Sequence, residues 1–259
     1  MVLRPEQTIL MGPGFNVLHK LTYDSMETQI TTPPLRSHAR LAGVLYLIII
    51  LSGLFSELVV RSGIIVPGDI RATAENILAK ETLFRIGFLS DLLMVMSDVG
   101  VALLFYLLFR HVNKGLSMLS AFFRLAQATV IGLNLLNMFI PLLLLNRSDF
   151  MQAFTDEQVY SLSSLFLEAH TYGYLISGVF FGVSCILLGV LIYRSEYFPR
   201  WLGILVLAAG ISYLIDCITN FLAPGYASLS EYLVISVAVI SELSLCLFLL
   251  IKGIRKIPA

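Results

Sequence analysis

The stretch SDLLMVMSDVGVALLFYLLF, residues 90–109, places two carboxylates inside an apolar run of membrane-spanning length. A helix needs about 20 predominantly apolar residues to cross the hydrocarbon core of a bilayer. Asp91 and Asp98 lie seven positions apart, so they fall on one face of such a helix, two turns from each other. A carboxylate near mid-bilayer costs roughly 2.5 to 3.5 kcal/mol on insertion scales and almost always faces a protein interior. The stretch therefore predicts a spanning helix within a bundle that has a polar interior.

Similar runs recur on both sides of this stretch. Of the 259 residues, 58% are hydrophobic and 13% are charged, whereas a soluble domain carries about a quarter charged residues. Every backbone amide must be paired internally in hydrocarbon, so the apolar runs are expected to be helices. They fall at about 41–60, 86–109, 117–145, 171–193, 201–223 and 232–251. The predicted fold is an all-α, polytopic membrane bundle of about six transmembrane helices.

The organisation of the chain follows from these runs. Residues 1–39 are expected to form a polar, disordered tail, with Met26 as an alternative start, and residues 40–255 a single transmembrane domain. Pro33-Pro34 argues against a helix that runs through this point into the membrane. The formal net charge is zero and there is no basic tract, so nucleic-acid binding has no support.

Two loops carry signals for short interfacial helices. Asp69 is the expected N-cap of a helix over 70–80 that lies on the membrane surface. Thr155 to Gln158 form a capping box, which predicts a helix that leads into the fourth span or bends away from it. Lys and Arg are more frequent in the loops on the side of both termini, which predicts that both termini are cytoplasmic.

Each apolar run also carries one polar stripe, and the stripes predict an intramembrane polar site. A carboxylate without a cationic partner in the membrane must be protonated, hydrated or bound to a cation, and Arg124 is the single arginine expected inside the bundle. Arg124 paired with Asp98 or Glu242 also has a structural interpretation, as an ion pair that fixes helix register. The candidate site residues are Glu57, Asp91, Asp98, Arg124, Gln127, Asn134, Asn137, His170, Asp216, Asn220 and Glu242.

Several motifs resemble a family of bacterial multi-pass membrane proteins, catalogued as domain of unknown function 4386. The motifs are RLAGVLYLII at 40–49, VPGD at 66–69, FRIGF at 84–88, SDLL at 90–93, FRLAQ at 123–127, NLLN at 134–137 and YLID at 213–216. The resemblance covers about residues 38 to 255. It implies a multi-pass protein of the bacterial cytoplasmic (inner) membrane, and it carries no activity, cofactor or catalytic residue.

Three functions stay open at this point. The favoured one is binding or transport of a small solute coupled to protons or a cation, with Asp98 and Glu242 carrying protons and Arg124 as counter-charge or anion anchor. The second is a membrane-embedded enzyme with a carboxylate acid–base pair or a metal held by Glu57, Asp91, Asp216 and His170. The third is a regulatory or scaffold protein. The expected partners are the lipid bilayer and a small solute, proton or cation. Six spans are few for a carrier, and assembly into a homo-oligomer would compensate for this.

Overall fold

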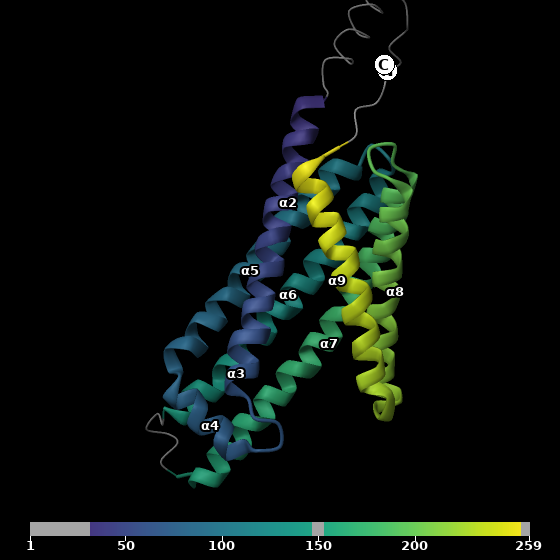
Figure 1. Cartoon of the computed structure of the whole chain (residues 1–259). Helices are drawn as coiled ribbons and strands as arrows, with labels where there is room; N and C mark the ends of the chain where they lie inside the picture. Colours follow the sequence, from purple (N-terminus) through teal and green to yellow (C-terminus); the bar gives the residue numbers. More distant parts are fainter. Residues whose placement is uncertain (1–31, 147–152, 255–259) are drawn as a thin grey trace, which may run out of the picture.

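The computed structural model describes residues 32–146 and 153–254, which are helical apart from short connections and contain no strand (Figure 1). Six helices in these ranges are long and apolar enough to cross a membrane, which confirms the predicted all-α, multi-pass bundle. The tail over 1–31, including Met26, lies outside the described residues. The spanning helices are α2 (Thr32–Phe55), α5 (Glu81–Phe109), α6 (Lys114–Leu145), α7 (Asp156–Arg194), α8 (Arg200–Leu222) and α9 (Ala227–Ile251).

The spans extend beyond the apolar runs at most of their ends. α2 begins at Thr32, ahead of the apolar run that starts at 41. Pro33 and Pro34 lie in the first turn, where the backbone needs no amide donors, so they begin this helix without weakening it. α6 continues through Pro141 to Leu145. Hydropathy detects only the part of a helix that lies within lipid. The helix can continue beyond it through polar residues, which a hydropathy pattern does not reveal.

The end of α2 changes its helical geometry. It continues as a π-helix, η1 (Ser56–Arg61), followed by the short α3 (Ser62–Ile64). The backbone N–H of Ser62 bonds to the carbonyl of Glu57, five residues back. A π-helical turn is wider than an α-helical one and is frequent at functional sites. The first span therefore ends at residue 64, and its last turns carry Glu57 and Arg61.

The two predicted loop helices are present. α4 (Ile70–Ala79) is capped by Asp69, whose side chain accepts a hydrogen bond from the backbone N–H of Ala72 at 2.9 Å. Thr155 and Gln158 form the expected capping box at the start of α7. α7 then runs without interruption to Arg194, so the capped helix and the fourth span are one element. Of the two alternatives for this segment, the helix that leads into the span is the one observed.

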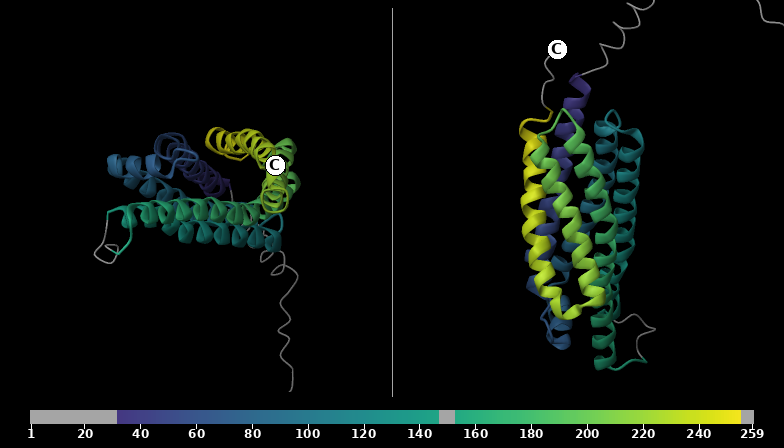
Figure 2. Two further views of the ribbon diagram at one scale, coloured as in Figure 1. Left: turned by 90° about the horizontal axis from the view of Figure 1, so that it is seen from below. Right: turned by 90° about the vertical axis from the view of Figure 1, so that its right-hand side faces the viewer.

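The spanning helices are arranged around a common interior. α2 packs against α5, α5 against α6, α6 against α7, α7 against α8, α8 against α9, and α9 against α2 (Figure 2). Gly43 lets α2 approach α9 closely, because a Cβ at this position would lie 2.9 Å from the backbone nitrogen of Leu250. The connection between α8 and α9 is a short 3₁₀ turn, η3 (Pro224–Tyr226). The start of α2 and the end of α9 lie at the same end of the bundle, as six spans require (Figure 1).

The buried core falls into two apolar clusters with a polar layer between them. One lies at the end that carries the start of α2 and includes Phe105, Leu188 and Leu249. The other lies at the opposite end, around η1 and α4, and includes Phe84 and Leu142. The buried charged, amide and imidazole side chains belong to α5, α6 and α7: Asp91, Asp98, Arg124, Gln127, Asn134 and His170. This polar layer is therefore the candidate functional site.

Candidate functional site

The innermost part of the polar layer is an ion pair between α5 and α6. Arg124 directs Nε and Nη2 at the same carboxylate oxygen of Asp98, with Nε at 2.8 Å. The other oxygen of Asp98 accepts from the side-chain amide of Gln127 at 3.2 Å. Both charged side chains are almost completely buried, at 3% and 4% exposure. The pairing of Arg124, left open between Asp98 and Glu242, is thus with Asp98.

Aromatic rings surround the Arg124 guanidinium. Its central carbon lies 5.2 Å from the ring centre of Tyr46, 5.8 Å from that of Phe105 and 5.1 Å from that of Phe181. The electron-rich face of a ring attracts a cation at such distances, most strongly where water is excluded. α2, α5 and α7 therefore all contribute to holding this one charge, in addition to the carboxylate on α5.

Glu242 faces the same interior from α9. Its carboxylate accepts a hydrogen bond from the hydroxyl of Tyr213 on α8 at 2.9 Å. The side chain is half-buried, and within the described ranges it makes no salt bridge to Lys or Arg. Tyr213 in turn packs edge-on against Phe181, one of the rings around Arg124. Glu242 is thus a membrane-depth acid next to the ion pair, with a neutral hydrogen-bond partner.

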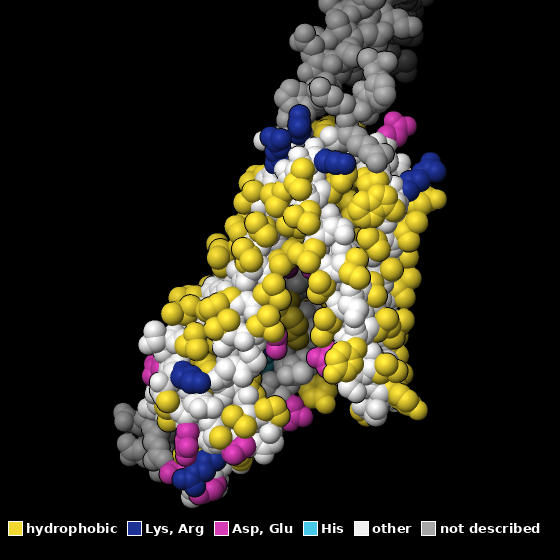
Figure 3. All heavy atoms as spheres, viewed as in Figure 1, with side chains coloured by type: hydrophobic (Ala, Val, Ile, Leu, Met, Phe, Trp, Pro, Cys, Tyr) yellow, Lys and Arg dark blue, Asp and Glu magenta, His cyan; other side chains and the backbone are white. Residues whose placement is uncertain are grey.

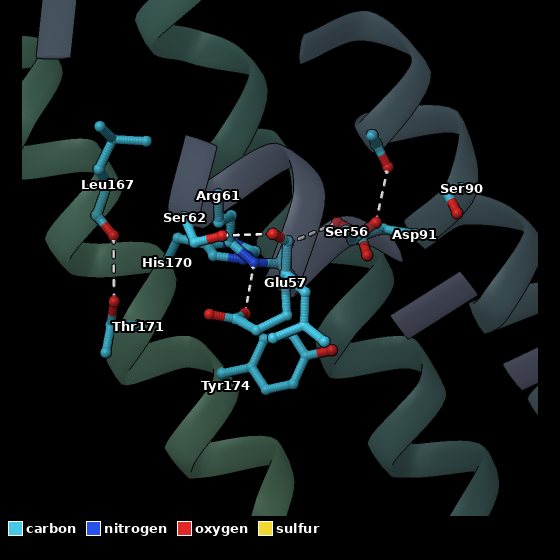
Figure 4. A network of polar contacts seen from close by, with 12 residues as sticks. Ser56, Glu57, Arg61, Ser62, Ser90, Asp91, Leu167, His170, Thr171 and Tyr174 are labelled. Atoms are coloured by element: carbon cyan, nitrogen blue, oxygen red, sulfur yellow. Dashed lines mark hydrogen bonds and ion pairs between the residues drawn. The ribbon is translucent and has the colours of Figure 1, made fainter. Parts of the chain in front are cut away.

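A second ion-pair centre lies toward the end of η1 (Figure 4). Arg61 donates from Nε to Glu57 at 2.7 Å and from Nη1 to Asp91 at 2.8 Å. Asp91 is only 1% exposed, whereas the Glu57 side chain is 64% exposed. The Arg61 guanidinium lies 6.0 Å from the ring centre of Tyr174 on α7. Three helical elements, η1, α5 and α7, therefore meet at this one guanidinium.

His170 lies beside this second centre, and its hydrogen-bond partner fixes a proton on Nδ1 (Figure 4). Nδ1 is 3.2 Å from the backbone carbonyl of Asn134, and a carbonyl only accepts, so Nδ1 carries the proton. The Asn134 side chain donates to the carbonyl of His170 at 2.8 Å, which closes a reciprocal pair between α6 and α7. Asn137 donates to the oxygen of the Asn134 side chain. In the neutral ring Nε2 is then a hydrogen-bond acceptor, and it is buried without a partner in the described part of the protein.

Asp216 belongs to a different part of the bundle. Its carboxylate accepts from the hydroxyl of Ser230 at 2.7 Å and from the amide of Asn220 at 3.1 Å. These contacts join the end of α8 to the start of α9, beside the turn η3. Asp216 and Asn220 therefore support the hairpin of α8 and α9, and within residues 32–146 and 153–254 no hydrogen bond or ion pair connects them with Glu57 or Asp91.

The metal hypothesis receives no support from this geometry. Within 32–146 and 153–254, no three His, Cys, Asp or Glu side chains are grouped so that they could hold a metal ion. Asp91 and Glu57 bond to the cation Arg61 instead, and Asp216 bonds to Ser230. The proposed set of Glu57, Asp91, Asp216 and His170 is not assembled.

Arg61 is the site residue that the sequence reasoning missed. It follows the apolar run over 41–60 directly, as a loop residue would, whereas Arg124 is the single arginine expected in the interior. The available signal was its position four residues after Glu57, the spacing at which helical side chains pair. Pairing at this spacing indicates that the helix continues for one more turn, which places Arg61 beside Asp91.

The interior is accessible from one side. α2 and α9 touch near Gly43, where the thiol of Cys246 lies 3.6 Å from the Gly43 carbonyl, and they diverge toward the opposite end (Figure 1). The surface is hollowed between them, and acidic side chains line the lower part of this hollow (Figure 3). The half-buried state of Glu242, Tyr213 and Tyr174 agrees with an interior that is partly open. We call this hollow the α2–α9 opening.

The comparison with family models agrees with the motifs. The model of the family described as "Domain of unknown function (DUF4386)" matches residues 41–253, nearly the whole of the membrane bundle. The chain belongs to this family. It is also 33% identical over 135 residues to an uncharacterized protein of the archaeon Archaeoglobus fulgidus, an alignment that covers 52% of this chain and 66% of that relative. The likeness therefore extends beyond bacterial proteins. No solved structure matches the chain.

Proposed function

We propose that the bundle binds and transports a small solute in exchange for, or together with, protons, and that Glu242 is the acid that takes up and releases the proton. The observation that carries this proposal is the hydrogen bond of Glu242 to the neutral hydroxyl of Tyr213, whose ring packs against Phe181, one of the rings around Arg124. Ionisable groups inside a membrane protein are typical of proton relays and of ion or substrate pathways.

The distribution of charges distinguishes Glu242 from the other interior acids. Asp98 is tied to Arg124, and Asp91 is tied to Arg61, so a change in the protonation of either would break a buried ion pair. Glu242 has a hydroxyl partner, which can donate to the carboxylate or accept from the protonated acid. A proton can therefore enter and leave Glu242 while both ion pairs stay intact.

The α2–α9 opening gives this acid a route to the outside of the bundle. Glu242 lies on α9, one of the two helices that border the opening, and Glu57 lies on η1, which continues the other. A solute that enters there meets Arg61 and Glu57 first and the Arg124 centre deeper in the membrane. In this proposal Asp98 keeps Arg124 in place, which is a different role from the proton carrier expected from the sequence.

The orientation of the bundle belongs to the same proposal. The end that carries the start of α2 exposes Arg36, Arg40, Arg110, Lys114, Arg194, Arg200 and Lys252, against Glu196 as the exposed acid in the described residues there. Short cytoplasmic loops carry an excess of Lys and Arg. We infer that this end faces the cytoplasm and that the α2–α9 opening faces away from it.

Carbodiimide labelling tests the proton-exchanging acid. Dicyclohexylcarbodiimide is membrane-permeant and reacts with protonated carboxyl groups, and the modified residue is identified by mass spectrometry of peptides. Labelling is expected at Glu242, falling as the pH is raised, while Asp98 and Asp91 stay unlabelled because both are engaged in buried ion pairs with Arg124 and Arg61. Labelling of Asp98 in preference to Glu242 would contradict the assignment.

A further inference from the structure

The connection between α7 and α8 forms a shallow hollow at the basic end of the bundle. It has a volume of about 790 Å³, and the side chains around it belong to the last turn of α7, the loop and the first turn of α8. The lining includes Tyr193, Arg194, Glu196, Arg200 and Trp201. No residue of the Arg124 or Arg61 centres lines this hollow, so it is separate from the ion pairs of the interior.

A narrower groove adjoins this hollow. It has a volume of about 280 Å³ and lies between the start of α8 and the end of α9, with Ser244, Leu247, Phe248, Ile251 and Lys252 in its wall. Trp201 lines both spaces and therefore connects them. Leu247 and Ile251 are exposed, so the groove presents an apolar surface to the lipid along the last turns of α9.

The charge at the junction of the two spaces is positive. Arg194, Arg200 and Lys252 are exposed and make no salt bridge within the described residues, while Glu196 is the one acid in the lining. Arg200 lies 5.6 Å from the ring centre of Tyr193, which keeps its guanidinium at the hollow. Three cations against one carboxylate leave the junction with an excess of positive charge beside an apolar groove.

We propose that this junction binds an anionic phospholipid, with the phosphate between Arg194, Arg200 and Lys252 and an acyl chain along the groove of Trp201, Leu247 and Ile251. The basic hollow matches the head group of such a lipid, and the apolar groove matches an acyl chain. The two spaces also lie in the order of head group and chain in a membrane, with the hollow at the end of the bundle and the groove along the last turns of α9. Basic pockets between spanning helices on the cytoplasmic side bind anionic head groups. Tryptophan is enriched at this interface because its ring is apolar and its N–H is polar.

Trp201 makes this proposal directly measurable, since it is the only tryptophan in the chain. The purified protein is reconstituted in bilayers that contain phosphatidylglycerol or phosphatidylcholine with the same brominated acyl chains, and quenching of Trp201 fluorescence reports the lipid beside it. Quenching is expected to be stronger with brominated phosphatidylglycerol. The double variant Arg194→Gln/Arg200→Gln is expected to weaken the preference roughly fivefold for each cation removed, the factor that corresponds to about 1 kcal/mol.

Matched variants separate the site from the general charge of this end of the bundle. Arg110→Gln/Lys114→Gln removes two exposed cations of the same end, one directly after α5 and one at the start of α6, outside both spaces, and is expected to keep the preference. Equal quenching by the two lipids in the wild type, or the same loss in both double variants, would overturn the proposal. So would relief of the quenching by millimolar inorganic phosphate, because that result assigns the junction to a free anion instead of a lipid.

Discussion

Removal of the Asp98 charge is expected to destabilise the fold strongly. Asp98→Asn keeps the shape of the side chain but leaves the Arg124 guanidinium without its carboxylate at 3 to 4% exposure. Loss of one partner of a buried ion pair costs about 3 to 5 kcal/mol. The three aromatic rings within 5.1 to 5.8 Å still attract the cation, so the lower part of this range, about 3 kcal/mol, is expected.

A double-mutant cycle in mixed micelles measures this effect. Unfolding by increasing sodium dodecyl sulfate is followed by circular dichroism for the wild type, Asp98→Asn, Arg124→Met and the double variant. The double variant is expected to be more stable than Asp98→Asn alone, because no unpaired charge remains in the interior. The control is Glu81→Gln, whose partner Arg85 is 47% exposed, and it is expected to change stability by less than about 0.5 kcal/mol. A loss below about 1 kcal/mol for Asp98→Asn, or a double variant as unstable as the sum of the single ones, would refute the reasoning.

Two further comparisons use the same unfolding assay. Asp91→Asn is expected to cost about 3 kcal/mol and Glu57→Gln less than about 0.5 kcal/mol, because Arg61 holds a buried carboxylate in the first case and an exposed one in the second. Equal losses would show that burial does not set the strength of these contacts. Gly210→Ala places a Cβ 2.6 Å from a backbone oxygen of α7 and is expected to cost about 1 to 3 kcal/mol, whereas Gly178→Ala, with no atom nearer than 4.0 Å, is expected to be neutral. A neutral Gly210→Ala would contradict the close packing of α7 and α8.

The number and type of the spanning helices were predictable, but their ends were not. An apolar run of about 20 residues has few alternatives to a helix in lipid, which is why all six spans were found. The start of α7 at Asp156 precedes its apolar run at 171 because the capping box begins the helix in a polar segment. Likewise, the first span extends to residue 64 because Glu57 and Arg61 pair along the helix and turn a polar segment into a further turn.

The residues of the polar layer were also predictable, but their pairing required the order of the helices around the interior. Helical spacing placed Asp98 and Arg124 on inward faces, but two acids were equally suitable as partners of Arg124. The arrangement decides between them, since α6 packs against α5, which carries Asp98, whereas α9 packs against α2 and α8. Asp216 shows the same need for the arrangement of the helices: residue type groups it with Glu57, Asp91 and His170 as a possible metal ligand, but its neighbours are Ser230 and Asn220 in the hairpin of α8 and α9.

Proton movement in liposomes tests the central claim most directly. Wild type, Glu242→Gln and Glu81→Gln are reconstituted in vesicles loaded with a pH-sensitive dye, and a panel of amino acids, amines and carboxylates is added in turn outside. We expect a solute of this panel to change the internal pH in the wild type and in Glu81→Gln but not in Glu242→Gln. A solute-driven pH change that proceeds at the wild-type rate in Glu242→Gln would contradict the role of Glu242 as the proton-exchanging acid.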